Sequence, residues 1–174
     1  MRNNLRANLE LSAQIAIAIA IVAVAGVLVK RNLFPSSNLT RPPQINAGEK
    51  LNVPNVDWEH NGKSLVFFLR KDCKYCTSSA PFYRQLIADA NARNVKLLAI
   101  LPNSLDDARQ YLKSLDLAID DVRSSSFAEY KINGTPTVLF VDNEGIVRRT
   151  WFGAQSDREG EMRNQLAQLF AGGD

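Results

Sequence analysis

The chain has very few of the residues that commonly bind metal ions. Its 174 residues include two cysteines, Cys73 and Cys76, and one histidine, His60. A structural zinc site needs about four ligands. A zinc site within one chain would therefore have to recruit carboxylates. We expect no bound metal and no other cofactor.

The chain also lacks an excess of charge after its first 31 residues. Residues 32–174 contain 17 Lys or Arg and 17 Asp or Glu. The net charge of +3 comes from four basic residues less one acidic residue: Arg2, Arg6, Lys30 and Arg31, less Glu10. These charges flank an apolar segment, and no basic patch typical of nucleic-acid-binding proteins remains. We therefore expect no nucleic-acid partner.

That apolar segment, residues 11–29, contains only two polar side chains, Ser12 and Gln14. A run of this length spans the hydrocarbon core of a bilayer, and we interpret it as a transmembrane anchor that stays attached. Two alternatives remain. Ala23-Val24-Ala25 before Gly26 resembles the cleavage site of a signal peptide, and a buried core helix is possible, although the segment lacks a polar face.

The sequence predicts four parts of the chain. Residues 1–10 form an N-terminal flank, residues 11–29 the anchor, residues 30–50 a proline-rich tether and residues 51–174 a folded domain. The flanking charges do not settle the orientation, because basic residues lie on both sides of the anchor. The basic residues after it could place the domain in the cytoplasm.

The two cysteines lie where a predicted strand is followed by a predicted helix. Residues 64–69 form a short apolar run typical of a buried strand, and residues 77–92 are expected to be helical. A helix N-terminus stabilises a thiolate. We expect Cys73, nearer the helix end and more exposed, to be the nucleophile, and Cys76 to be the buried resolving thiol.

The neighbours of the pair carry charge. Arg70, Lys71 and Lys74 add positive charge, which favours a thiolate, and Asp72 opposes it. A C-x-x-C motif alone could also be half of a zinc site or an inert structural disulfide. We favour a redox pair, and this preference depends on a second motif further along the chain.

The remaining pattern predicts an α/β fold with a central mixed sheet flanked by helices on both faces. Pro81 is expected to kink the helix after the cysteines. Further strands are expected at 95–101, 137–141 and 146–152, with a hairpin turn at 142–145. Helices are expected after the N-cap residues Ser104 and Ser156, with a brief one near 127–130. Residues 51–58 are expected to add a short edge strand, and residues 117–122 a strand or loop.

The segment from Tyr130 to Phe140, with Gly134-Thr135-Pro136 in it, followed by Gly145 and Trp151-Phe152-Gly153, resembles the second half of a thioredoxin. Pro81 also matches the helix-kinking proline of that family. The resemblance covers residues 51–174. It implies a cis proline at Pro136 that faces the cysteine pair, whereas an ordinary trans proline that begins a strand is the alternative.

The resemblance also implies how a client is bound. The backbone of Thr135 beside Pro136 would pair with an extended client segment as an added strand. Lys74 and Tyr75, between the cysteines, are the expected further contacts. The sequence departs from thioredoxin in having Asp72 where that family has tryptophan and Phe67 where it has a buried aspartate.

The anchor, tether and Thr-Pro pair resemble the membrane-anchored TlpA/ResA-type proteins, which serve cytochrome c maturation and related tasks. That group often carries a glutamate near the position of Ser79. The resemblance implies a protein-disulfide oxidoreductase that acts on protein thiol or disulfide clients, with a membrane or extracytoplasmic electron donor or acceptor. Because disulfides persist outside the cytoplasm, we expect the domain on the extracytoplasmic (periplasmic) side of the cell membrane.

Two other functions remain open. A peroxiredoxin-like peroxidase shares this fold, but its Pro-x-x-x-Thr/Ser-x-x-Cys pattern would fall on Val66 and Arg70. A copper-binding module would use Cys73 and Cys76 with His60 as the third ligand. We expect His60 in the loop before the first core strand, away from the pair.

Overall fold

The computed structural model describes residues 44–172. The predicted anchor and most of the predicted tether lie outside these residues. None of the helices between residues 44 and 172 has both the length and the apolar character that a bilayer-spanning helix needs. The elements are, in order, α2 (Trp58–Asn61), β1 (Ser64–Phe68), α3 (Lys74–Ser78), α4 (Ala80–Asn91), β2 (Lys96–Leu101), α5 (Leu105–Ser114), β3 (Asp121–Ser124), the 3-10 helix η1 (Phe127–Tyr130), β4 (Thr137–Val141), β5 (Val147–Phe152) and α6 (Glu159–Ala171).

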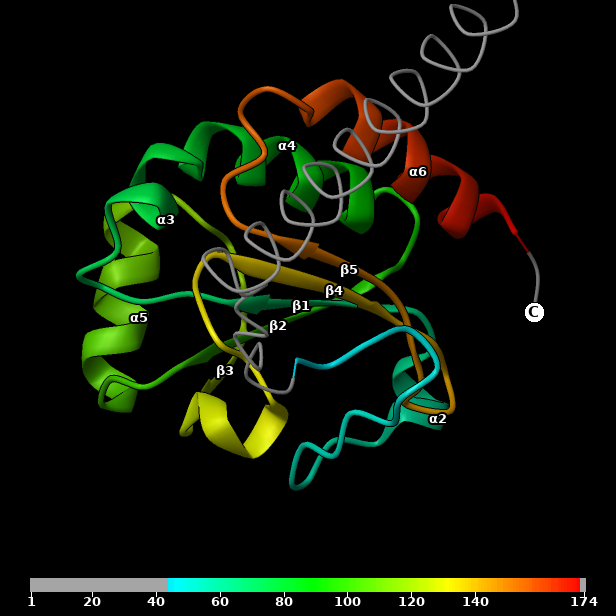
Figure 1. The fold of residues 1–174 in the computed structure, drawn as a ribbon, viewed down its shortest axis with the longest axis horizontal. Helices are drawn as coiled ribbons and strands as arrows, with labels where there is room; N and C mark the ends of the chain where they lie inside the picture. Colours follow the sequence, from blue (N-terminus) through cyan, green and yellow to red (C-terminus); the bar gives the residue numbers. More distant parts are fainter. Residues whose placement is uncertain (1–43, 173–174) are drawn as a thin grey trace, which may run out of the picture. The chain divides into compact units, whose positions relative to one another are not determined.

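The five strands form one mixed sheet in the order β3-β2-β1-β4-β5 (Figure 1). β1, β2 and β3 run parallel, whereas β4 is antiparallel to β1, and β5 is antiparallel to β4. The predicted mixed sheet is therefore confirmed. Parallel strands need crossover connections, and the helices between β1, β2 and β3 supply them.

The central strand β1 is buried on both faces, which explains its unbroken apolar sequence. Leu65 and Phe67 pack in the core that also contains side chains of α4, α5 and α6. Val66 and Phe68 pack in a second core with the segment before β1 and with η1. Full burial of each such side chain contributes about 1.5–3 kcal/mol, so this strand anchors both layers.

Residues 45–50, which we assigned to the tether, contact the domain. Ile45 is buried, and its N–H donates to the carbonyl of Lys131 at 3.1 Å. Lys50 forms a single bridge with Ile146. The edge strand expected at 51–58 is absent from this segment. Its apolar side chains pack directly on the sheet face instead, and the last of them, Trp58, begins α2.

Three predicted elements begin two or more residues away from their predicted starts. The helix expected at 77–92 begins earlier, at Lys74, and is interrupted at Ser79. Pro81 accounts for the interruption because it has no N–H to continue the hydrogen-bond pattern, and it occupies the first turn of α4. The strand expected near 117–122 is β3, four residues later than the predicted start.

The last helix begins at Glu159, and Ser156 does not cap it. The preceding residues form a turn, in which Arg158 N–H donates to the carbonyl of Gln155 at 2.7 Å. The buried Gln155 amide donates to the carbonyls of Phe152 and Gly153 at 3.0 and 3.1 Å. These bonds hold the chain in a turn past residue 156. Ser104, by contrast, accepts a hydrogen bond from Asp107 N–H and caps α5 as predicted.

The predicted hairpin turn at 142–145 is present. Gly145 has a φ of +79°, and a Cβ there would lie 2.6 Å from the ring of Trp58. The N–H of Leu51 donates to the Gly145 carbonyl at 2.8 Å. Glycine is therefore required both by the backbone conformation and by the close approach of the segment before β1.

Asp142 organises this turn from a buried position. Its Oδ1 accepts hydrogen bonds from the N–H groups of Glu144 and Ile146, both at 2.9 Å, and its Oδ2 accepts one from Arg148. Burial alone opposes ionisation, but the hydrogen bonds outweigh it and lower the pKa of Asp142. A lowered folded-state pKa contributes stability above the unfolded-state pKa, and this stability is lost as the pH falls through the folded-state value.

Asp142→Asn should lower the free energy of unfolding at pH 7 by about 1–3 kcal/mol, because an amide cannot accept the same three hydrogen bonds. The difference from the unchanged protein should begin to shrink as the pH falls below about 4, the ordinary Asp pKa at which the unfolded chain takes up the proton, and its ionisation-linked part should be lost below the lowered folded-state pKa of Asp142. Urea unfolding at pH 7 and at a pH well below about 4 measures this difference in the free energy of unfolding. Glu144→Gln is the control, since that side chain is exposed. A difference independent of pH would contradict the assignment.

Candidate active site

The cysteine pair lies at the carboxyl end of the central strand. Leu69 N–H donates to the Ile100 carbonyl at 3.2 Å, which continues the pairing of β1 with β2. The chain then turns, and Cys73 N–H donates to the Arg70 carbonyl at 3.2 Å. Cys73 has extended backbone angles and is the N-cap residue of α3. The predicted strand-to-helix position is therefore confirmed.

The two cysteines are joined by a disulfide, with their Cα atoms 5.2 Å apart. Cys76 N–H, in the first turn of α3, donates to the Cys73 sulfur at 3.1 Å. Cys76 is fully buried, whereas Cys73 is half-buried. The predicted difference in exposure is confirmed, and Cys73 is the more accessible of the two sulfurs.

The loop before β4 contacts the first cysteine. The Thr135–Pro136 peptide bond is cis, as the resemblance implied. The Thr135 carbonyl oxygen lies 3.5 Å from the Cys73 sulfur. Thr137 Oγ1 donates to the Gly134 carbonyl at 2.8 Å, and Gly153 N–H donates to the Pro136 carbonyl at 2.8 Å. The first bond closes the loop on itself, and the second ties it to the residue after β5.

Two of the three predicted cations near the cysteines are paired. Arg70 lies 3.3 Å from Asp72, and Lys71 lies 2.9 Å from Asp107 on α5. The hydrogen bond from Lys71 lowers the pKa of Asp107. Lys74 forms no ion pair with any residue of the described range. Among the described residues, Lys74 is therefore the one of these three cations whose charge is not offset by an ion pair.

No buried carboxylate lies beside Cys76 in the part of the chain that the structure describes. Phe67 occupies the position of the thioredoxin aspartate and packs edge-on against Tyr83, with ring centroids 5.5 Å apart. Burial raises the pKa of Tyr83 well above its usual value. Asp142, the buried carboxylate among residues 44–172, lies at the opposite end of β4. Among the described residues, no buried carboxylate is therefore placed to accept a proton from a reduced Cys76.

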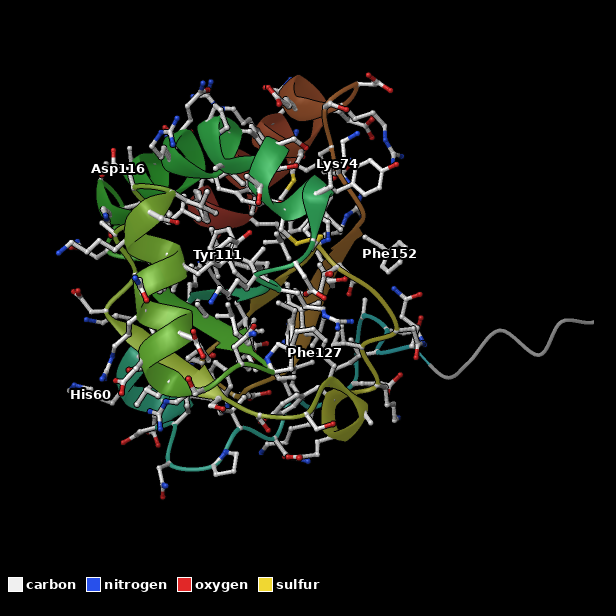
Figure 2. The ribbon with its side chains drawn as sticks, turned by 90° about the vertical axis from the view of Figure 1, so that its left-hand side faces the viewer. His60, Lys74, Tyr111, Asp116, Phe127 and Phe152 are labelled. Carbon is white, nitrogen blue, oxygen red and sulfur yellow. A yellow bond between two sulfur atoms is a disulfide. The ribbon has the colours of Figure 1, made fainter. Side chains whose placement is uncertain are left out.

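Phe152 is a site residue that the sequence analysis missed. Its side chain is 50% exposed, and it lies opposite Thr137 in the pairing of β4 with β5. Its ring covers Gly134 so closely that a Cβ on Gly134 would lie 2.7 Å from it. Figure 2 shows Phe152 on the same side of the molecule as Lys74. The sequence could have indicated this exposure, because side chains alternate along a strand. Trp151 points into the core, so the side chain of the next residue points away from it.

The remaining predicted site residues lie as follows. Tyr75 is 62% exposed, so Tyr75 and Phe152 are two exposed aromatic side chains near the cysteines and the Thr135–Pro136 loop. His60 lies in α2, not in a loop, and Figure 2 shows it at the other end of the molecule from Lys74. Residues 44–172 contain no cluster of three His, Cys, Asp or Glu side chains that could hold a metal. The structure thus does not bring His60 to the cysteine pair.

The sheet order, the cysteine pair at the start of a helix and the facing cis proline define the thioredoxin-like class of proteins. Within this class, the chain belongs to the AhpC/TSA family, whose model matches residues 36–150. None of the curated proteins searched matches the chain.

Solved structures share the fold. A protein assigned as the thiol:disulfide interchange protein DsbE, from Chlorobium tepidum, has a TM-score of 0.60 and 16% identity, covering 74% of this chain and 98% of that one. The thioredoxin domain of a thiol-disulfide oxidoreductase from Bacteroides vulgatus has a TM-score of 0.57 and 14% identity, covering 70% and 99%. A thiol-disulfide isomerase from Corynebacterium glutamicum has a TM-score of 0.56 and 15% identity, covering 78% and 100%.

Phe152→Ala should slow the reduction of a protein disulfide such as insulin by about tenfold, because the client then buries less apolar surface against the protein, a difference of about 1.4 kcal/mol. Its reaction with a small disulfide, oxidised dithiothreitol, should be unchanged because the sulfurs are untouched. Leu105→Ala, at another exposed apolar residue, is the matched control. Equal slowing of both substrates would show that Phe152 only supports the fold.

Proposed function

We propose that the protein is a membrane-tethered thiol–disulfide oxidoreductase that exchanges disulfides with protein clients through Cys73 and Cys76. One observation carries the proposal: the half-buried Cys73 sulfur lies 3.5 Å from the Thr135 carbonyl, while its partner Cys76 is fully buried. An accessible sulfur beside the half-buried Thr135 can receive a peptide, and a buried sulfur three residues later can release it.

Bonds and electrons balance when the reduced cysteine pair reacts with one client disulfide. The Cys73 thiolate attacks one client sulfur, a mixed disulfide forms, and the second client sulfur leaves as a thiolate. Cys76 then attacks the Cys73 sulfur, the client is released with two reduced sulfurs, and the Cys73–Cys76 disulfide forms. Because no buried carboxylate lies beside Cys76 in the described residues, its proton passes to the departing client thiolate or to water.

Two features support a peptide as the client. The backbone of Thr135, next to the buried Pro136, can pair with an extended segment and hold the client sulfur near Cys73. Tyr75 and Phe152 offer apolar surface to the client's neighbouring side chains. Lys74 adds positive charge, which stabilises the thiolate of Cys73 and favours the reduced form of the pair.

The peroxidase and copper-binding alternatives have less support. Arg70 and Val66 occupy the positions that the peroxidase pattern assigns to Thr/Ser and Pro, and the two sulfurs already form a pair suited to exchange. The only histidine lies in α2, away from the pair. A peroxide-consumption assay with dithiothreitol tests the first alternative, and stoichiometric copper binding by the purified protein tests the second.

Trapping identifies the nucleophile and the clients together. Cys76→Ser should accumulate mixed disulfides between Cys73 and client proteins, because the second step of the exchange has lost its thiol. Non-reducing electrophoresis and mass spectrometry of the trapped species measure this. Cys73→Ser is the matched control and should trap far less, since Cys76 is buried. Preferential trapping by Cys73→Ser would reverse the two roles.

The anchor and the side of the membrane belong to the proposal as well. The apolar run at 11–29 supports an anchor, and the disulfide chemistry favours an extracytoplasmic domain. Fusion of alkaline phosphatase to the C-terminus should give an active, membrane-bound enzyme, because that reporter folds only where disulfides form. An inactive fusion would place the domain in the cytoplasm, and activity in the soluble extracytoplasmic fraction would indicate that the segment is a cleaved signal.

A further inference from the structure

The strand β3 lies at one edge of the sheet, opposite the edge formed by β5 (Figure 1). It pairs with β2 on its inner side. Within residues 44–172, no backbone group is hydrogen-bonded to its outer side. An edge strand of this kind presents unpaired N–H and C=O groups to a further strand.

The direction of these groups can be derived from one hydrogen bond. Ser125 N–H donates to the Leu101 carbonyl on β2 at 3.0 Å. Backbone groups alternate in direction along a strand. The backbone N–H and C=O groups of Asp121 and Arg123 therefore also point toward β2, and those of Val122 point outward. A two-fold axis at Val122 would let two copies exchange both bonds of a hydrogen-bonded antiparallel pair.

The side chains beside Val122 are self-complementary in charge. In an antiparallel pair centred on Val122, Asp121 of each copy lies opposite Arg123 of the other. Opposite charges that face each other across strands stabilise the pairing. In the single chain the two side chains bond to each other at 2.6 Å and remain about one third exposed, so both are available at the edge.

The surfaces on the two sides of β3 fit the same arrangement. On the helix side, Val122 borders a cavity of about 360 Å³ whose apolar lining includes Leu117 and Ile119. The Val122 side chain of a second copy would extend this apolar wall. Asp121 and Arg123 line a second cavity, of about 520 Å³, whose lining is mixed: it includes Ser124 and Ser125 and also the apolar residues Val53, Leu105 and Tyr130. The charged pairs would lie at this second cavity.

We propose that β3 is a self-association surface, at which two copies of the chain pair antiparallel about Val122 and form one continuous sheet. The charge pattern selects a second copy over an unrelated strand, because the sequence Asp-Val-Arg is complementary to itself only in this register. The interface is isologous, as in most two-fold dimers. The cysteine site lies at the ends of β1 and β4 and would remain open in such a dimer.

Charge reversal tests the register. Using sedimentation equilibrium on the full-length chain in detergent, we expect reversible dimers of the unchanged protein. Asp121→Arg alone or Arg123→Glu alone should raise the dissociation constant at least about tenfold, equivalent to about 1.4 kcal/mol, because like charges then face each other twice. An equal mixture of the two variants should regain the original affinity, since each introduced charge then faces its opposite.

The mixture also separates pairing between chains from effects within one chain. Each variant lacks its internal Asp121–Arg123 bond, so recovery on mixing cannot arise from that bond. Asp157→Arg, an exposed residue before α6, is the matched control and should associate like the unchanged protein. An unchanged protein that stays monomeric, variants that associate as well as it does, or a mixture no tighter than its components would each overturn the proposal.

Discussion

The antiparallel pairing of β1 with β4 is the interaction on which the rest of the site depends. In this register Phe68, the last residue of β1, lies opposite Thr137, the first residue of β4. The residues just after β1 and just before β4 must therefore lie side by side. These are the loop that carries Cys73 and the loop that contains Thr135–Pro136, which are 62 positions apart in the sequence at their point of contact.

The burial of β1 on both faces keeps this register fixed. A shift by one residue would turn Leu65 and Phe67 from the helix-side core to the opposite face, and every other side chain with them. Neither face could accept that exchange without cavities and steric overlap. The precision of the site is thus set by packing several residues away from the sulfurs.

Electrostatics around the pair follow from the same packing. α5 brings Asp107 to Lys71, and the turn before Cys73 brings Asp72 to Arg70. Exposed ion pairs of this kind contribute little to stability, about 0–1 kcal/mol. Their effect on the site is different, because each pair neutralises one cation near the cysteines, whereas Lys74 has no ion pair among residues 44–172.

Features of the protein that depend on local chemistry could be predicted from the amino-acid sequence. The apolar run of β1, the C-x-x-C pair after it, the Ser104 cap and the turn closed by Gly145 were all predicted, since neighbouring residues decide strands, caps and turns. The resemblance added the cis bond before Pro136. Three other features depend on distant residues and follow from the fold: the start of α6 after Gln155 bonds back to the end of β5, the pairing of Lys71 with Asp107, and the position of Phe152 over Gly134. These could not be predicted from the sequence because each requires knowing which segments lie next to one another in space.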